Sequence, residues 1–103
     1  MIHRREDLAT KPILYLFTQD NCVNCPAAKA VVSEAFDGSD IVDIETIDLQ
    51  KMDPDFEFKL LENQIFISST PAIIVANSSK MKLLYSGNIP EVDTIRQEVR
   101  DFA

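Results

Sequence analysis

Short apolar runs and longer helical patterns alternate along this chain. The runs at about residues 12–18, 41–49, 72–76 and 81–86 have the length and side chains of β-strands. Apolar residues recur at helical spacing over residues 27–36, in a second helix opened by Asp53 and Pro54, and over about residues 90–102. The predicted order is therefore βαβαββα, that of an α/β chain.

The predicted elements also indicate how the strands pair and what they bury. Residues 12–18 are almost continuously apolar, as in a central strand, whereas residues 41–49 alternate so that one face should be wetter. The connection between these two strands predicts a parallel, right-handed crossover, and residues 77–80 predict a hairpin turn. Phe56, Leu60, Leu61 and Ile65 should anchor the second helix. By position we expect the phenylalanines to be mostly core residues: Phe17, Phe36, Phe56, Phe58, Phe66 and Phe102.

The only two cysteines, Cys22 and Cys25, lie between the first strand and the helix that follows it. The free N–H groups and the positive dipole end of a helix stabilise a thiolate at such a junction. Pro26 fits there, because proline is tolerated only in a first helical turn, so the helix should begin near Val23 or Asn24. Any lowering of the Cys22 pKa from about 8.5 would come mainly from this helix terminus.

Two thiols at this spacing can carry out disulfide exchange. A thiolate attacks a substrate disulfide and forms a mixed disulfide, which a second thiol of the same chain then resolves. Two intervening residues on a first helical turn allow the cysteines to join without strain. Our hypothesis is that Cys22 attacks and Cys25 resolves. The residues just before them, Asp20 and Asn21, have the chemistry of a turn and a helix cap.

Length, charge and the N-terminal residues limit the domain number, the partners and the cellular location that we expect. The chain has 103 residues, enough for one domain with its own core, and a formal net charge of −7. That charge argues against nucleic acid or an anionic membrane as the main partner. The charged N-terminus lacks the apolar core of a secretory signal, and no run reaches the roughly 20 apolar residues of a membrane span. We expect a cytoplasmic monomer, although a secreted form with its signal removed would look the same.

Metal binding by one chain has little support in the sequence. In the cytoplasm the cysteines of a two-cysteine chain are more often catalytic or metal-binding than joined in a structural disulfide. A zinc ribbon, however, would need a second cysteine pair. We interpret His3, near the N-terminus, as a solvated residue. We therefore expect no cofactor besides the redox-active disulfide of Cys22 and Cys25. The alternative is that two chains share four thiolates around zinc or an iron–sulfur cluster.

These features, in this order, resemble the thioredoxin fold that thioredoxins and glutaredoxins share, over residues 12–102. Cys22-Val23-Asn24-Cys25 resembles the redox motif of that family. Thr70-Pro71 resembles the loop whose proline is cis and faces the disulfide, and Gly87 resembles the glycine that closes the hairpin. The resemblance implies a four-stranded mixed sheet flanked by helices, in a domain at residues 12–103 behind an N-terminal extension at residues 1–11.

The resemblance also implies a substrate site around the sulfurs. Pro71 would be cis, and Thr70 would offer its backbone N–H and C=O groups to an extended substrate segment. Val23, Asn24 and Ile67 would complete the contact patch. The substrates would be disulfide-containing proteins, reduced with electrons from an unidentified reductase or from glutathione, as part of electron transport and cell redox homeostasis.

Two residues typical of thioredoxins are absent. The tryptophan before the first cysteine and the buried aspartate six residues before it are replaced by Asn21 and Leu16. Glutaredoxins also lack that acid, but their glycine-rich, aspartate-containing motif is poorly matched at residues 86–93. We therefore favour a thioredoxin-like protein disulfide reductase. The alternatives are a glutathione-dependent reductase and a non-catalytic adaptor or redox sensor with the same fold.

Overall fold

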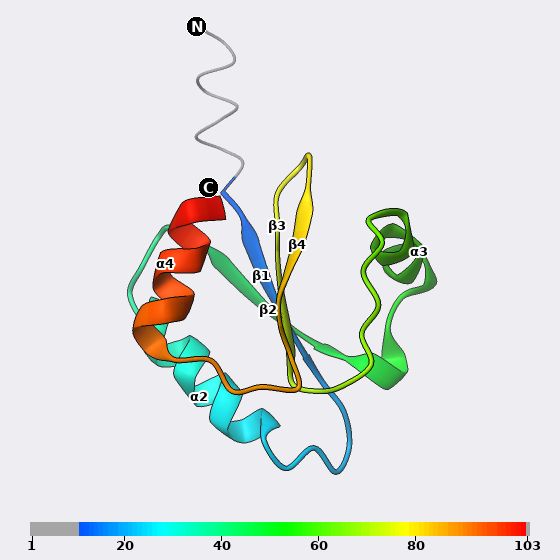
Figure 1. Ribbon diagram of the computed structural model, residues 1–103, viewed down its shortest axis with the longest axis horizontal. Helices are drawn as coiled ribbons and strands as arrows, with labels where there is room; N and C mark the ends of the chain where they lie inside the picture. Colours follow the sequence, from blue (N-terminus) through cyan, green and yellow to red (C-terminus); the bar gives the residue numbers. More distant parts are fainter. Residues whose placement is uncertain (1–10, 103) are drawn as a thin grey trace, which may run out of the picture.

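A computed structural model describes residues 11–102 of the chain (Figure 1). The predicted N-terminal extension, apart from Lys11, lies outside the described residues, and so does His3. None of the helices in the described part of the chain is long and apolar enough to cross a membrane. The elements, in chain order, are β1 (Ile13–Thr18), α2 (Cys25–Phe36), β2 (Asp43–Asp48), the 3₁₀ turn η1 (Leu49–Lys51), α3 (Pro54–Glu62), β3 (Ala72–Ala76), β4 (Met81–Ser86) and α4 (Val92–Phe102).

The four strands form one mixed sheet in the order β2-β1-β3-β4. β1 pairs with β2 in parallel and with β3 in antiparallel, and β3 pairs with β4 in antiparallel. β1 is thus a central strand, as its continuous apolar run predicts. The βαβαββα order, the parallel pairing of the first two strands and the four-stranded mixed sheet are all confirmed.

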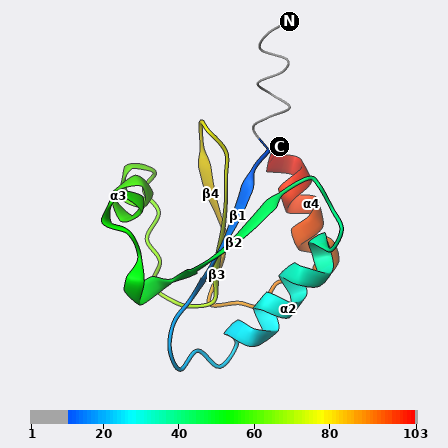
Figure 2. The ribbon, with the colours of Figure 1, turned by 180° about the vertical axis from the view of Figure 1, so that it is seen from behind.

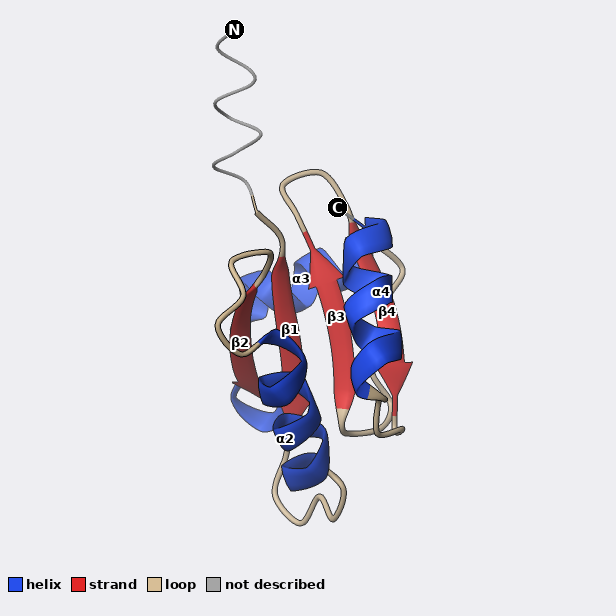
Figure 3. Cartoon of the chain, turned by 90° about the vertical axis from the view of Figure 1, so that its left-hand side faces the viewer, coloured by secondary structure: helices blue, strands red, loops and turns tan. Residues whose placement is uncertain are grey.

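Helices cover both faces of the sheet. α2 and α4 lie on one face and α3 lies on the other, as Figures 1 and 2 show from opposite sides and Figure 3 shows with the strands side by side. Alternate residues of β1 point to the two layers: Leu14 and Leu16 pack under α2 and α4, and Phe17 packs under α3. The second layer is closed by Phe56 of α3, whose ring lies 4.8 Å from that of Tyr15.

The helices of the first layer are also joined by a hydrogen bond. Arg96 of α4 donates from Nε to the carbonyl oxygen of Ala35, in the last turn of α2, at 2.8 Å. Carbonyl groups at the end of a helix have no partner within that helix, so a side-chain donor stabilises them. This contact fixes α4 against the C-terminal end of α2.

Several expectations about burial are wrong. β2 is an edge strand whose first four residues are exposed on both faces, so the predicted difference between its faces is absent there. Most of the phenylalanines belong to the core as expected, because Phe17, Phe36 and Phe102 are buried and Phe56 packs against the layer under α3. The exceptions are Phe58 and Phe66, which are 62% and 70% exposed, and Leu61, expected to anchor α3, is 51% exposed. Phe58 and Leu61 are exposed because Phe56 and Leu60 already occupy the side of α3 that faces the sheet.

Candidate active site

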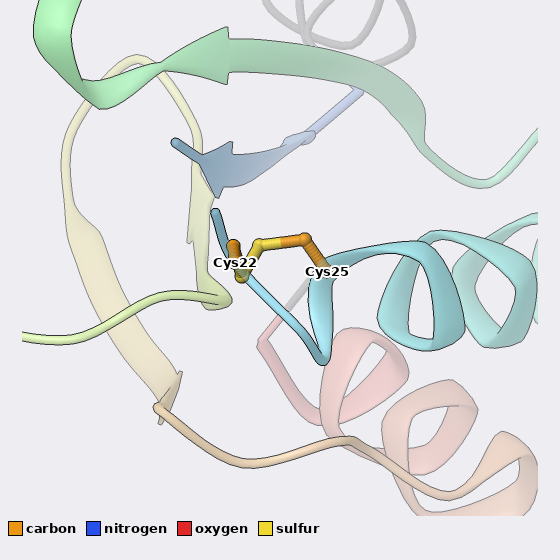
Figure 4. The surroundings of a disulfide bond; sticks show 2 residues. All are labelled: Cys22 and Cys25. Atoms are coloured by element: carbon orange, nitrogen blue, oxygen red, sulfur yellow. A yellow bond between two sulfur atoms is a disulfide. The ribbon is translucent and has the colours of Figure 1, made fainter. Parts of the chain in front are cut away.

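Cys22 and Cys25 form a disulfide at the N-terminal end of α2 (Figure 4). Their Cα atoms are 5.4 Å apart. Cys25 is the first residue of α2, Asn24 is its N-cap, and the first helical hydrogen bond runs from the Ala28 N–H to the Asn24 carbonyl oxygen at 3.0 Å. The helix therefore begins where Pro26 predicts, with both sulfurs at the strand-to-helix junction.

The cap of α2 differs from the one expected. Asp20 does not cap the helix, because the N-cap is Asn24, and the Asn24 side chain makes no capping hydrogen bond. Asn21 does provide the turn, with a left-handed backbone at φ 63° that asparagine tolerates. As a result, the N-cap side chain does not occupy the N–H groups of the first turn of α2, and such groups stabilise an anion placed at a helix N-terminus.

The two sulfurs differ in their access to solvent. Cys22 lies in the loop after β1 and is partly exposed, whereas Cys25 is only 7% exposed. A disulfide partner arriving from solvent can therefore reach Cys22 more easily than Cys25. The attacking role of Cys22 and the resolving role of Cys25 stay a prediction.

The Thr70-Pro71 bond is cis, as the resemblance implies, and the loop that carries it reaches the same end of the sheet. Ala72 pairs with Phe17 in the β1–β3 register, which places Pro71 level with the end of β1 from which the cysteine loop leaves. Pro71 is fully buried and Thr70 is half-buried. Within residues 11–102 the backbone N–H and C=O of Thr70 form no hydrogen bond with another backbone group.

Gly87 holds this loop in place. Its N–H donates to the carbonyl oxygen of Pro71 at 2.7 Å, and its backbone has a left-handed φ of 81°. A Cβ atom at this position would lie 3.1 Å from Cβ of Ser69. Sequence reasoning noted Gly87 but not its neighbour Ser69, because nothing in a serine two residues before a proline indicates such a contact.

The residues expected to contact a substrate differ in their exposure to solvent. Val23 is 90% exposed and Asn24 is exposed, both between the two cysteines. Ile67 packs against the layer under α3, so its role as a substrate contact stays a prediction. Ile89, which the sequence did not single out, is 41% exposed in the loop that leaves β4 at this end of the sheet.

No charged group of the described core lies buried beside the disulfide. Leu16, at the position of the typical buried aspartate, is 1% exposed within the α2 and α4 layer. No polar or charged side chain of the described residues is buried. Asp20 and Lys29 are exposed, and the described part of the chain holds no cluster of His, Cys, Asp or Glu side chains suited to a metal ion. The helix terminus is thus the main electrostatic feature at the sulfurs.

Neither cysteine lines any of three cavities found within residues 11–102. These cavities surround α3, with volumes of about 370, 300 and 390 Å³. Small-molecule sites are usually concave pockets, whereas macromolecular partners bind flatter surfaces. The setting of the disulfide therefore suits a segment of another protein better than a small ligand enclosed in a pocket.

Comparisons with known proteins extend this picture. No family model and no curated protein matches the sequence. Among solved structures, the germline-specific thioredoxin Deadhead from Drosophila melanogaster is similar, with a TM-score of 0.66, 17% identity, and coverage of 99% of this chain and 91% of that chain. Mitochondrial thioredoxin 3 from Saccharomyces cerevisiae gives a TM-score of 0.66 at 11% identity, with coverage of 97% and 89%.

A mutant thioredoxin from Halobacterium salinarum is similar to the same degree, with a TM-score of 0.68, 13% identity, and coverage of 91% of this chain and 76% of that chain. At these identities the likeness concerns the fold and not the activity. The sheet order, the helices on both faces and the position of the cysteine pair agree with it. The chain has a thioredoxin-like fold that carries a CxxC pair at the start of α2.

Proposed function

We propose that this protein is a thiol-disulfide oxidoreductase that reduces disulfides in other proteins. The observation that carries the proposal is the asymmetric pair, a partly exposed Cys22 joined to a buried Cys25 at the N-terminus of α2. A thioredoxin-like fold around the pair supports a redox role. The exposure of Val23 and Asn24, between the two cysteines, favours protein substrates.

The reaction has two exchange steps. The Cys22 thiolate attacks one sulfur of the substrate disulfide, that disulfide breaks, and the leaving thiolate takes a proton from water. Cys25 then loses its proton and attacks Sγ of Cys22, which releases the second substrate thiol and forms the Cys22–Cys25 disulfide. The substrate gains two electrons and the protein loses two. An external dithiol or thiol reductant must supply two electrons before the next cycle.

The surroundings of the sulfurs have separate roles in this proposal. The uncapped N–H groups of α2 stabilise the Cys22 thiolate. The unpaired backbone groups of Thr70 bind an extended substrate segment, as an edge strand would. Val23 and Asn24 contribute side-chain contacts. The proposal includes a cytoplasmic setting, where reductants keep thiols reduced, and a monomer acting on protein partners.

The test is alkylation of the reduced protein as a function of pH, with mass spectrometry assigning the label to one cysteine or the other. We expect Cys22 to react with an apparent pKa below about 8.5 and Cys25 to stay protected. The matched variants are Cys25→Ser, which should trap a mixed disulfide with a protein substrate, and Cys22→Ser, which should not. Equal reactivity of both thiols, or no trapped complex with Cys25→Ser, would contradict the proposal and favour an adaptor role.

A further inference from the structure

A group of three large apolar side chains lies on the surface at α3, away from the disulfide. Phe58, Leu61 and Phe66 are 62%, 51% and 70% exposed. Single exposed apolar residues are ordinary on proteins, but adjacent large ones mark interaction surfaces. We refer to these three residues as the α3 patch.

Helical geometry places two of these residues on one stripe. Phe58 and Leu61 are three positions apart, so their side chains are neighbours on the helix surface. Phe56 and Leu60 belong to the layer that packs on the sheet. Because successive residues are 100° apart, Phe58 and Leu61 point roughly opposite to Phe56 and Leu60. The stripe therefore does not take part in the core beneath α3.

A groove connects this stripe to the third residue. Leu61 and Phe66 both line a cavity of about 300 Å³, together with other apolar side chains that include Met52, Ile65 and Ile67. Glu57 is the one charged residue among its lining residues. A groove lined mainly by apolar residues, beside an exposed apolar stripe, has the form that receives the apolar face of a helix.

Carboxylates border the patch on both sides. On the helix, Glu57 lies on one side of the Phe58–Leu61 stripe, and Asp55 and Glu62 lie on the other; all three are exposed. The cation of the helix, Lys59, lines a different cavity with Tyr15 and Phe56. The rim of the patch is therefore negatively charged.

We propose that the α3 patch and its groove dock an amphipathic helix of a partner protein, with apolar residues on one face and lysine or arginine residues along its borders. Apolar residues of such a helix would cover Phe58, Leu61 and Phe66, and its cations would face the carboxylate rim. A second copy of this chain fits less well. In a two-fold pair the patch would meet itself, so the carboxylates of one copy would face those of the other, and each chain has a net charge of −7.

This surface is separate from the two cysteines. Neither cysteine lines the groove, which shares only Ile67 with the predicted substrate contacts. A partner docked there would leave the disulfide open to a substrate. The docking proposal can therefore fail while the reductase proposal stands, and the reverse is also possible.

The test uses the full-length ¹⁵N-labelled protein and two model helical peptides with the same leucine face, one with lysine borders and one with glutamate borders. We expect the lysine peptide to shift amide resonances of α3 and of residues 64–67. The glutamate peptide should bind at least about tenfold more weakly. Raising the salt concentration from about 50 to 500 mM should weaken only the lysine peptide, because rim charges are screened.

Variants locate the binding site and control for general apolar exposure. Phe58→Ser and Leu61→Ser should each weaken the lysine peptide by about tenfold or more. Ile41→Ser, at another exposed apolar residue, should change nothing. A Glu57→Lys/Glu62→Lys double variant should bind the glutamate peptide more tightly than the lysine peptide. This variant keeps the apolar side chains of the patch, so it tests the carboxylate rim alone. Sedimentation of the free protein tests the rival occupant, since a dimer lost in Phe58→Ser would assign the patch to a second copy.

Three results would overturn the proposal. The first is no binding of the lysine peptide at about 1 mM. The second is equal affinity for the two peptides. The third is resonance shifts confined to the residues around the disulfide, including Val23 and Ile89.

Discussion

Two glycines with the same backbone conformation offer a matched test of how the Thr70–Pro71 loop is held. Gly38 and Gly87 have φ values of 71° and 81°, both in the left-handed region. A Cβ added at Gly38 meets nothing within 4 Å, whereas one at Gly87 lies 3.1 Å from Cβ of Ser69. Gly38→Ala and Gly87→Ala therefore share the backbone cost and differ in one contact.

The expected magnitudes follow from this difference. Placing alanine in the left-handed region costs about 1–2 kcal/mol at either position. At Gly87 the neighbouring Ser69 must also move by a few tenths of an ångström, and because it lies on an exposed loop we assign this step the lower end of overpacking costs, about 1 kcal/mol. Gly87→Ala should thus lower the free energy of unfolding by about 1 kcal/mol more than Gly38→Ala. Displacement of Ser69 should also shift Thr70 and slow disulfide reduction by about three- to tenfold.

The assay is urea unfolding of the oxidised protein, paired with the rate at which the reduced protein cleaves a protein disulfide. A Ser69→Gly change in the Gly87→Ala background removes the contacting Cβ, so it should bring the cost of Gly87→Ala down to that of Gly38→Ala and restore the rate. Equal losses of stability for the two alanine variants, with unchanged rates, would refute the idea that Ser69 couples Gly87 to the loop.

Two further predictions concern the α2 and α4 layer. The hydroxyl of Tyr85 donates to Oε1 of Glu98 at 2.6 Å, and burial, followed by that hydrogen bond and the Glu98 charge, raises the pKa of Tyr85 above 10.0. The folded state therefore holds this proton more tightly than the unfolded state, so the contribution of Tyr85 to the free energy of unfolding is complete below about pH 10 and declines above it. Urea titrations of Tyr85→Phe should show a shallower loss of stability between about pH 9 and 11.5 than those of the unmodified protein. An equal slope would exclude this assignment. Arg96→Ala should lower the free energy of unfolding by about 1 kcal/mol, because the Ala35 carbonyl loses its donor. The control Arg100→Ala, at an exposed residue of the same helix, should lower it by less than about 0.5 kcal/mol. Equal losses would contradict a specific role for Arg96.

The parts of the fold that the sequence predicts best are those in which local chemistry and packing agree. β3 and β4 have the bounds expected, because an apolar run on each side is interrupted by a turn with its own hydrogen bonds. Oδ1 of Asn77 accepts from the N–H groups of Ser79 and Lys80 at 2.8 and 2.9 Å. Asparagine favours turns because its side chain can accept from backbone N–H groups two or three residues on, so this hairpin is predictable from local sequence.

The errors arise where burial depends on distant parts of the chain. A phenylalanine near a helix suggests a core residue, but only the position of α3 over Tyr15 and Phe17 determines which side of that helix is covered. Phe56 takes that position and Phe58 does not. The same holds for β2, because its place at the sheet edge follows from the order of all four strands.

The candidate site shows the same division between local and distant information. The cysteine spacing and Pro26 predict a pair at a helix start, and both are local features. The close approach of Ser69 to the Gly87 backbone, which leaves little room for a Cβ, joins residues 18 positions apart, and the sequence contains no pattern for it. The cis Thr70-Pro71 bond was expected only through the resemblance, since most bonds before proline are trans.

The absence of a buried acid gives this site a different electrostatic basis from that of a typical thioredoxin. Leu16 fills the position with an apolar side chain, and the described core holds no buried polar side chain near Cys25. In the proposed reaction a proton leaving Cys25 then passes to water or to the departing substrate thiolate, because none of the carboxylates in residues 11–102 is buried. In the proposed function the Cys22 thiolate depends on backbone N–H groups at the start of α2, where the N-cap Asn24 makes no side-chain capping bond. A helix terminus and access to water are therefore the two features on which the proposed chemistry at this disulfide rests.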